Sequence, residues 1–137
     1  MATWSYEAFA SANSGRDGIS ELEHKVMAKL ESLGARAEHA KTAMTNVIGG
    51  MARAVVYYPD ALLSVPTARK ISGWRKGDAN TIADSSDTER YKEEMYQSIV
   101  EMLNALSDTQ AAWSKISATA CKNGCATITI WYPTETA

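Results

Sequence analysis

The 137-residue chain has little cysteine, little proline and no long apolar run, and its charges nearly balance. Two cysteines are too few for a mini-protein built on disulfides. No apolar segment approaches the roughly 18 residues of a membrane-spanning helix, and the most apolar stretch, VIGGMARAVVYY, is interrupted by Arg53. A formal net charge of −2 gives no overall attraction to nucleic acid or to an anionic membrane. Binding to either would therefore require a local cluster of charges.

The N-terminal stretch MATWSYEAFASANSG has neither the basic segment nor the apolar core of a cleaved secretory signal. We therefore expect synthesis in the cytoplasm without a cleaved signal peptide, with a place in a virion or export by a signal-independent route left open. An apolar fraction of 45% and a charged fraction of 22% are ordinary for a soluble globular protein. The length predicts a single domain over residues 1–137.

A long stretch in the first half of the chain has the apolar spacing of a helix. Ser20 and Glu23 form a capping box, and apolar or small residues then recur every three or four positions until a proline ends the pattern. This spacing predicts one long helix over residues 20–58. Gly49 and Gly50 lie inside it and predict a bend, because glycine weakens a helix interior.

The second half repeats this signal with Ser86 and Glu89 as the capping box, which predicts a second long helix over residues 87–120. Residues 1–18 read as an N-terminal arm or short helix, and 59–86 as a mixed connector. No internal repeat is recognised. The predicted fold is all-α: an antiparallel helical hairpin or small bundle of two long helices, with short accessory helices and an extended or single-strand C-terminal arm.

The arm, residues 121–137, contains the segment ATITIWY, whose polar and apolar residues alternate as in a strand. No obvious partner strand exists. Three alternatives stay open: an arm packed along the helices, pairing with a strand hidden in residues 59–86, or pairing with another molecule. The last alternative makes the arm an assembly element through its apolar and aromatic residues Ile128, Ile130, Trp131 and Tyr132.

The two cysteines, Cys121 and Cys125, flank a turn sequence at the predicted end of the second helix. They read either as buried apolar thiols in a reducing compartment or as a disulfide that fixes the turn. A metal site is not expected, since two more ligands would be needed and no histidine is near in sequence.

A basic cluster with one indole stands in the connector, in the sequence ARKISGWRKG. Such a cluster can bind phosphates, with the indole as a stacking platform, or it can bind a protein partner. It can equally be a solvated loop with the indole buried. The candidate binding residues are Arg69, Lys70, Trp74, Arg75 and Lys76.

The sequence carries no catalytic or cofactor motif, so we predict no enzyme activity, no cofactor and no metal. His24 and His39 are too far apart on one predicted helix to share an ion. Glu93 and Glu94 are adjacent and diverge on a helix, so they do not form an acid–base pair.

The first functional hypothesis is a self-associating helical subunit of a larger assembly, such as a phage particle or a secretion apparatus, with itself as partner. The alternative is a small binding protein or inhibitor, of the phage anti-defence or chaperone kind, that occludes a larger partner through a surface patch. Nucleic-acid binding through the basic cluster is a third option and is not favoured.

Overall fold

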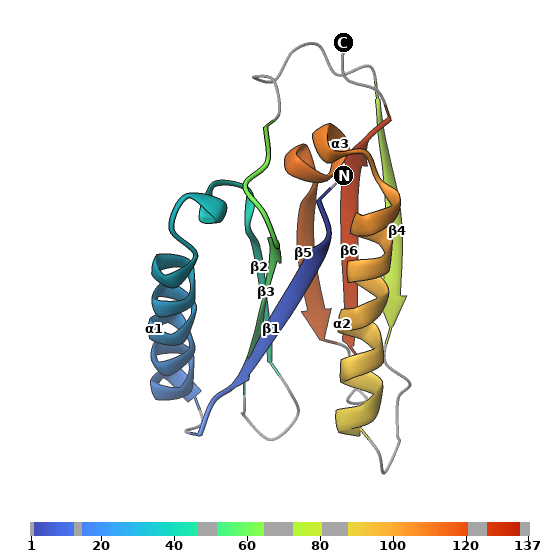
Figure 1. Ribbon diagram of the computed structural model, residues 1–137. Coiled ribbons are helices and arrows are strands. Elements are labelled where there is room, and N and C mark those ends of the chain that lie inside the picture. The colour runs from blue at the N-terminus through green and yellow to red at the C-terminus, as the bar shows by residue number, and fades with distance from the viewer. Residues whose placement is uncertain are drawn as a thin grey trace.

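The computed structural model describes residues 2–12, 15–46, 52–64, 73–80, 88–120 and 126–134. Strands and helices alternate along it (Figure 1), so the fold is mixed α/β and the all-α prediction is wrong. In chain order the elements are β1 (Trp4–Ala10), α1 (Gly15–Leu33), the short 3-10 helix η1 (Gly34–His39), β2 (Lys41–Asn46), β3 (Ala52–Pro59), β4 (Trp74–Asn80), α2 (Thr88–Ala105), α3 (Asp108–Trp113), β5 (Lys115–Ala120) and β6 (Ala126–Pro133).

The same strand–helix–strand–strand unit occurs twice. The first unit forms an antiparallel sheet in the order β1-β3-β2, called sheet 1 here, and the second forms sheet 2 in the order β4-β6-β5. In each unit the strand that comes last in the chain is the central one. The chain therefore contains an internal repeat, and the interpretation that it has none is wrong.

Equivalent hydrogen bonds occur inside each of the two units. In the first unit, Arg36 in η1 donates to the carbonyl oxygen of Pro59, 3.5 Å away, at the end of β3. In the second, the side-chain amide of Gln110 in α3 donates to the carbonyl oxygen of Pro133, 2.9 Å away, at the end of β6. The same number of residues separates Arg36 from Gln110 and Pro59 from Pro133. The similarity thus extends from the topology to single hydrogen bonds.

The two helices cover different numbers of sheet faces. α1 packs on one face of sheet 1, where Leu22 meets Ala54 with Val26 and Phe9 beside them. α2 packs against β1, β4 and β6, so it lies between the other face of sheet 1 and one face of sheet 2 (Figure 1). The edge strands β2 and β5 lie side by side, which joins both sheets around one core. The largest fully buried side chains of this core are Tyr57, Ile99, Leu103, Ile128 and Ile130.

The helix predicted over residues 20–58 ends at Leu33, where Gly34, with a φ of 61°, begins η1. The remainder forms β2 and β3, because pairing with β1 satisfies the backbone groups of a segment whose apolar run fits either a helix or a doubly buried strand. The predicted bend at Gly49 and Gly50 lies outside the described residues.

The second helix is present but shorter than predicted. α2 ends at Ala105, and Ser107 then caps α3 by accepting a hydrogen bond from the backbone of Gln110. The rest of the predicted helix forms β5. The proposed cap at Ser86 lies outside the described residues.

The predicted C-terminal arm is a strand in the middle of sheet 2. β6 pairs with β4 on one side and with β5 on the other, so its backbone groups are satisfied within the chain. Of the three alternatives, pairing with a strand from residues 59–86 is correct, since β4 comes from that segment. The packed arm is wrong, and the strand offers no free edge to another molecule.

Candidate functional site

The face of sheet 2 that points away from α2 carries exposed aromatic and charged side chains. We call it the open face. Trp131 in its centre is 42% exposed and Trp74 near its margin is 46% exposed. Its residues are Trp74, Lys76 and Asp78 from β4, Thr129 and Trp131 from β6, and Lys115 and Ser117 from β5.

Strand register explains why these side chains share one face. Trp131 stands opposite Lys76 on β4 and opposite Lys115 on β5, so the indole is flanked by two cations in one row. Successive residues of a strand point to opposite faces. The neighbouring row, with Ile130 opposite Gly77 and Ile116, therefore faces the core, and Ile130 is 0% exposed.

Hydrogen bonds fix the polar side chains of the open face. Thr129 donates to Asp78 at 2.8 Å, and the ammonium group of Lys76 lies 3.2 Å from the same carboxylate. These two bonds hold the pKa of Asp78 below its usual value. The indole N–H of Trp131 donates to Ser117 at 3.3 Å. The tryptophan is therefore oriented in the free protein, and Lys115 at the end of the row is exposed.

Two of the three residues in the equivalent row of sheet 1 are buried. There, Tyr57 stands opposite Tyr6 and Lys41, in the places of Trp131, Lys76 and Lys115. Tyr57 is 0% exposed because it packs against α2, and Lys41 is 8% exposed because it lies against Trp4 and α3.

Polar contacts accompany this burial. The Tyr6 hydroxyl donates to the carboxylate of Glu93 on α2, and burial together with this bond raises the pKa of Tyr6 to about 12. The Tyr57 hydroxyl donates to the backbone carbonyl of Tyr96 at 3.2 Å. Lys41 donates to the carbonyl of Ala112 at 3.0 Å, and burial lowers its pKa to about 8.

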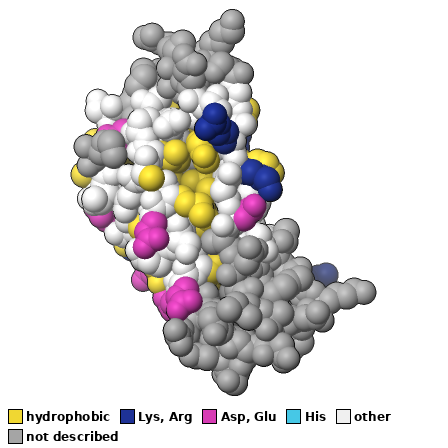
Figure 2. All heavy atoms as spheres, turned by 90° about the vertical axis from the view of Figure 1, so that its right-hand side faces the viewer, with side chains coloured by type: hydrophobic (Ala, Val, Ile, Leu, Met, Phe, Trp, Pro, Cys, Tyr) yellow, Lys and Arg dark blue, Asp and Glu magenta, His cyan; other side chains and the backbone are white. Residues whose placement is uncertain are grey.

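The predicted basic cluster is divided by the strand. Trp74 and Lys76 lie on the open face, whereas Arg75 alternates with them and points to the other side of β4. All three are exposed. Arg69 and Lys70 lie outside the described residues. Figure 2 looks at the edge of sheet 2 and shows apolar side chains gathered in the middle of this side, with lysine or arginine beside them.

The predicted assembly residues are also divided. Ile128 and Ile130 are buried against α2, and Tyr132 is half-buried beside them. Only Trp131 reaches the open face. Cys121 and Cys125 lie outside the described residues. Lys115, Ser117 and Thr129 were not selected from the sequence, although the alternation in KISATA and the recurrence of its lysine relative to KTAMTN are visible there.

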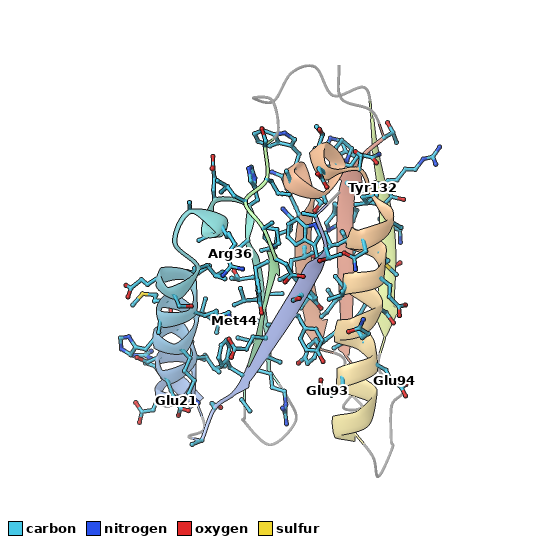
Figure 3. All side chains as sticks on the ribbon, viewed as in Figure 1. Glu21, Arg36, Met44, Glu93, Glu94 and Tyr132 are labelled. Atoms are coloured by element: carbon cyan, nitrogen blue, oxygen red, sulfur yellow. The ribbon has the colours of Figure 1, made fainter. Side chains whose placement is uncertain are left out.

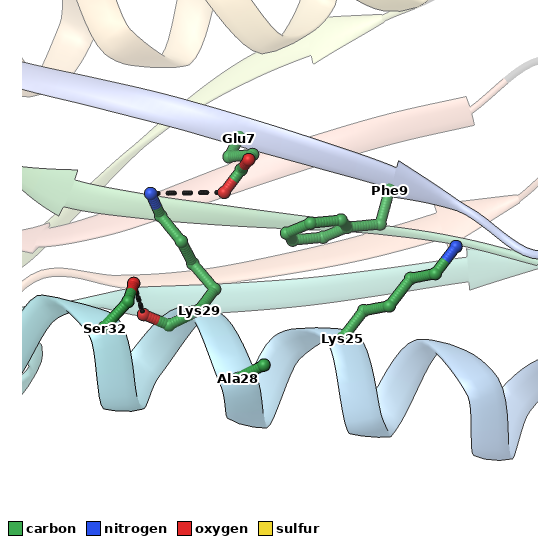
Figure 4. Close-up of a pocket in the computed structure, with 6 residues that line it drawn as sticks. All are labelled: Glu7, Phe9, Lys25, Ala28, Lys29 and Ser32. Carbon is green, nitrogen blue, oxygen red and sulfur yellow. Dashed lines mark hydrogen bonds and ion pairs between the residues drawn. The ribbon is translucent and has the colours of Figure 1, made fainter.

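A groove of about 390 Å³ lies between α1 and β1 (Figure 4). In the second unit the corresponding space is filled, because Met102 packs onto Gly77, where a Cβ atom would lie 2.8 Å from its sulfur. Ala28 takes the place of Met102 in the first unit and leaves the groove open. The lining is Glu7, Phe9, Lys25, Ala28, Lys29 and Ser32.

The charges in this groove are already balanced. Lys29 pairs with Glu7 at 3.1 Å, and Lys25 pairs with Glu21 at 3.0 Å. A charged ligand would have to break one of these pairs, whereas the open face presents Lys115 directly. The open face is therefore the stronger candidate site.

The described part of the chain offers little support for a metal site or a membrane-spanning helix. No cluster of three or more metal-ligating side chains occurs there, and none of its helices has the length and apolarity to cross a membrane. Glu93 and Glu94 leave α2 on opposite sides in Figure 3.

Comparison with family models, curated proteins and solved structures finds no match to this chain. The functional argument therefore depends on the open face itself.

Proposed function

We propose that the protein is a non-enzymatic binding protein whose open face binds an acidic amphipathic helix of a protein partner. One observation carries this proposal. The face that corresponds to it in sheet 1 is covered by α2, whereas Trp74 and Trp131 remain 46% and 42% exposed on sheet 2. Large exposed aromatic side chains are typical of binding surfaces.

The contact between α2 and sheet 1 supports a helix as the bound element. In it, α2 contacts β1, and Tyr96 of α2 packs against Tyr6 and accepts a hydrogen bond from Tyr57 through its backbone carbonyl, so one face of this sheet accepts a helix (Figure 1). An aromatic residue at the centre of the row, Tyr57 there and Trp131 here, supplies the apolar contact.

The charge of the open face supports an acidic partner. In sheet 1, Tyr6 donates to Glu93 of the covering helix. Lys76 stands in the place of Tyr6, and Lys115 flanks Trp131 on the other side. A helix with a carboxylate beside its apolar stripe would meet Lys115 directly, whereas Lys76 is already paired with Asp78 on the same face. Such complementarity speeds association and selects the partner.

The proposal keeps the binding-protein hypothesis. It drops the hypothesis of a self-associating helical subunit, because the predicted helical architecture is wrong.

Two-dimensional NMR of the indole N–H groups tests the proposed binding of an acidic helix, since the chain has four tryptophans and two of them lie on the open face. The probe is a designed acidic amphipathic helix of about 18 residues. We expect it to shift the signals of Trp74 and Trp131 and to leave those of Trp4 and Trp113 in place.

A peptide with every glutamate replaced by lysine is the matched control and should not bind. A single-stranded oligonucleotide is the second probe. Shifts of Trp74 and Trp131 with the oligonucleotide alone, lost steeply with added salt, would replace the proposal by nucleic-acid binding. No shift with either probe would overturn it.

A further inference from the structure

The groove between α1 and β1 differs in kind from the equivalent region of the second unit. There, Leu103 is 1% exposed and Met102 lies on Gly77, so the region is closed and apolar. In the first unit, Lys29 stands in the place of Leu103. Glu7 stands in the place of Gly77. The region is instead an open groove of about 390 Å³ with a cation and an anion in its wall, a size and composition that suit a small molecule.

We propose that this groove binds a free α-amino acid with an apolar side chain. The groove lies on the face of sheet 1 opposite to α2, so it is separate from the open face and independent of the function proposed there (Figure 1). The carboxylate of the ligand meets the ammonium group of Lys29, and its ammonium group meets the carboxylate of Glu7. Its side chain lies over Phe9 and Ala28.

Lys29 and Glu7 hold each other in position at one end of the groove (Figure 4). The Lys29 ammonium group lies 3.1 Å from the Glu7 carboxylate and 4.4 Å from the centre of the Tyr58 ring. The Lys29 side chain is 19% exposed and that of Glu7 is 46% exposed. An ammonium group has three hydrogens to donate and a carboxylate has two oxygens to accept, so each can form further hydrogen bonds to a ligand.

This pair selects a ligand that carries both charges. A ligand with a single charge is attracted by one member of the pair and repelled by the other. With a zwitterion the four charges alternate in sign, so every neighbouring contact is attractive and the Lys29–Glu7 pair stays intact. In an α-amino acid both charged groups are attached to one carbon atom, which places them about as close together as the charges of Lys29 and Glu7.

Phe9 and Ala28 give the groove an apolar wall, which lies between the charged pair and Lys25 (Figure 4). Phe9 is half-buried and Ala28 is exposed. Because exposed ion pairs contribute little in water, binding also requires contact of an apolar side chain with this wall. Lys25 is bound to Glu21 at 3.0 Å and to the carbonyl oxygen of Ala10 at 3.2 Å. An acidic side chain would have to compete with Glu21 there, so an apolar one is favoured.

Two-dimensional NMR of the isotope-labelled chain tests this, with L-leucine and L-phenylalanine as probes. We expect dissociation constants in the millimolar range, because the charged groups are partly exposed. The backbone amide signals of Phe9, Ala28 and Lys29 should shift. The indole signals of Trp74 and Trp131 should stay in place, which separates this groove from the open face.

Three compounds are matched controls for leucine. N-acetyl-leucine lacks the ammonium group, leucine amide lacks the carboxylate, and glycine lacks the apolar side chain. We expect each to bind about fivefold more weakly than leucine, or weaker still. Equal binding of either blocked derivative would overturn the selection of a zwitterion, and equal binding of glycine would overturn the role of the apolar wall.

Two variants locate the ligand. Ala28→Met places in the groove the side chain that closes the second unit, and it should abolish the shifts. Ala105→Met is its control, because Ala105 is exposed at the end of α2, away from the groove. Glu7→Gln should weaken leucine binding and strengthen N-acetyl-leucine binding, since Lys29 then meets a carboxylate without a neighbouring anion. A loss of folding cannot produce such an exchange of preference.

The remaining outcomes are also decisive. Leucine binding that persists in Ala28→Met would place the ligand elsewhere and overturn the inference. No shift with either leucine or phenylalanine would overturn it as well. Both results leave the function proposed for the open face standing, because that function is measured on Trp74 and Trp131 with a different probe.

Discussion

The central strands β3 and β6 have the same place in their sheets and different sequences, ARAVVYYP and ATITIWYP. β3 is buried on both faces: its consecutive residues Val55 and Val56, which point to opposite faces, are 2% and 0% exposed. β6 is buried on one face, with Ile130 at 0% and Trp131 at 42%. A strand covered twice reads as a continuous apolar run, and a strand covered once alternates. The difference therefore reports how many helices cover each sheet.

Exposure to solvent explains some, but not all, of the sequence differences between the open face and the equivalent face of sheet 1. On the open face, Thr129 stands in the place of Val55, and Lys76 in the place of Tyr6. Such exchanges are expected wherever a cover is missing. Trp74 and Trp131 are not, because a merely solvated face has no need of large aromatic residues. These two indoles are the reason to treat the open face as a binding surface.

Shortening the aromatic residue at the centre of each sheet should give the largest contrast. Tyr57→Ala removes a buried ring and should lower the free energy of unfolding by about 3–5 kcal/mol. Trp131→Ala removes a half-exposed ring, and we expect a loss of about 1 kcal/mol or less. Chemical denaturation of both variants measures the difference. Equal losses would mean that Trp131 is buried in solution, as it would be in a stable assembly.

Replacing the two lysines at equivalent positions of the sheets, Lys41 and Lys115, should change stability in ways that depend differently on pH. Lys41 has a pKa of about 8 in the folded chain, because it is buried. An unfolded lysine titrates near 10.4, so between those pH values the unfolded chain holds the extra proton and stability rises with pH. Lys41→Met removes this dependence.

The stability advantage of Lys41→Met over the wild type should therefore be largest near pH 7. It should shrink by on the order of 2 kcal/mol by pH 10. The matched variant Lys115→Met, at the exposed equivalent position, removes a charge that helps to lower the pKa of Lys41, so its stability should still rise with pH but less steeply than that of the wild type. Urea denaturation at several pH values compares them. A difference between Lys41→Met and the wild type that does not change with pH would show that the ammonium group of Lys41 reaches water.

Exchanging residues in the next row should give a smaller contrast. Val55→Thr places a hydroxyl in an apolar layer and should cost about 1.5 kcal/mol. Thr129→Val removes the hydrogen bond to Asp78 on an exposed face, and the change should stay within about 0.5 kcal/mol. Thermal unfolding of the two variants tests the pair. If Thr129→Val is the more harmful change, the Thr129–Asp78 bond matters more than the covering helix.

The sequence predicted some elements because their signals are local. α2 lies inside the predicted range 87–120, where an amphipathic stripe follows good helix-forming residues. The alternation of β6 was recognised for the same reason. β3 was not, since its run AVVYY is apolar at every position and no period distinguishes a doubly buried strand from a buried helix. The number of covering helices is a tertiary property that the segment itself does not display.

The repeat could have corrected this error. Lys41 and Lys115 are separated by the same number of residues as Tyr58 and Tyr132 and as Pro59 and Pro133. Aligning the halves on these residues transfers the strand assignment of β6 to β3. β4 had no comparable signal, because its core-facing row contains Gly77, which leaves room for Met102.

The residues of the open face divide in the same way into those that the sequence indicated and those that only strand pairing brings together. Trp74 and Lys76 were selected from their residue types, and Trp131 from the alternating segment ATITIWY. Lys115 and Ser117 were assigned to a helix, and only strand pairing places them beside Trp131. A cluster made by register cannot be found without the strands that make it.

The smallest expected effect comes from the groove between α1 and β1. Ala28→Met places in the first unit the side chain that closes this space in the second, where Met102 lies on Gly77. The new side chain should cover part of Phe9. We expect it to raise the free energy of unfolding by about 0.5 kcal/mol or less, which thermal unfolding measures as a slightly higher melting temperature. Ala28→Gln is the control of similar length, and it should give no gain because it buries a polar amide. A loss of more than about 1 kcal/mol for Ala28→Met would mean that the groove is already filled in solution, since an overpacked site forces its neighbours apart.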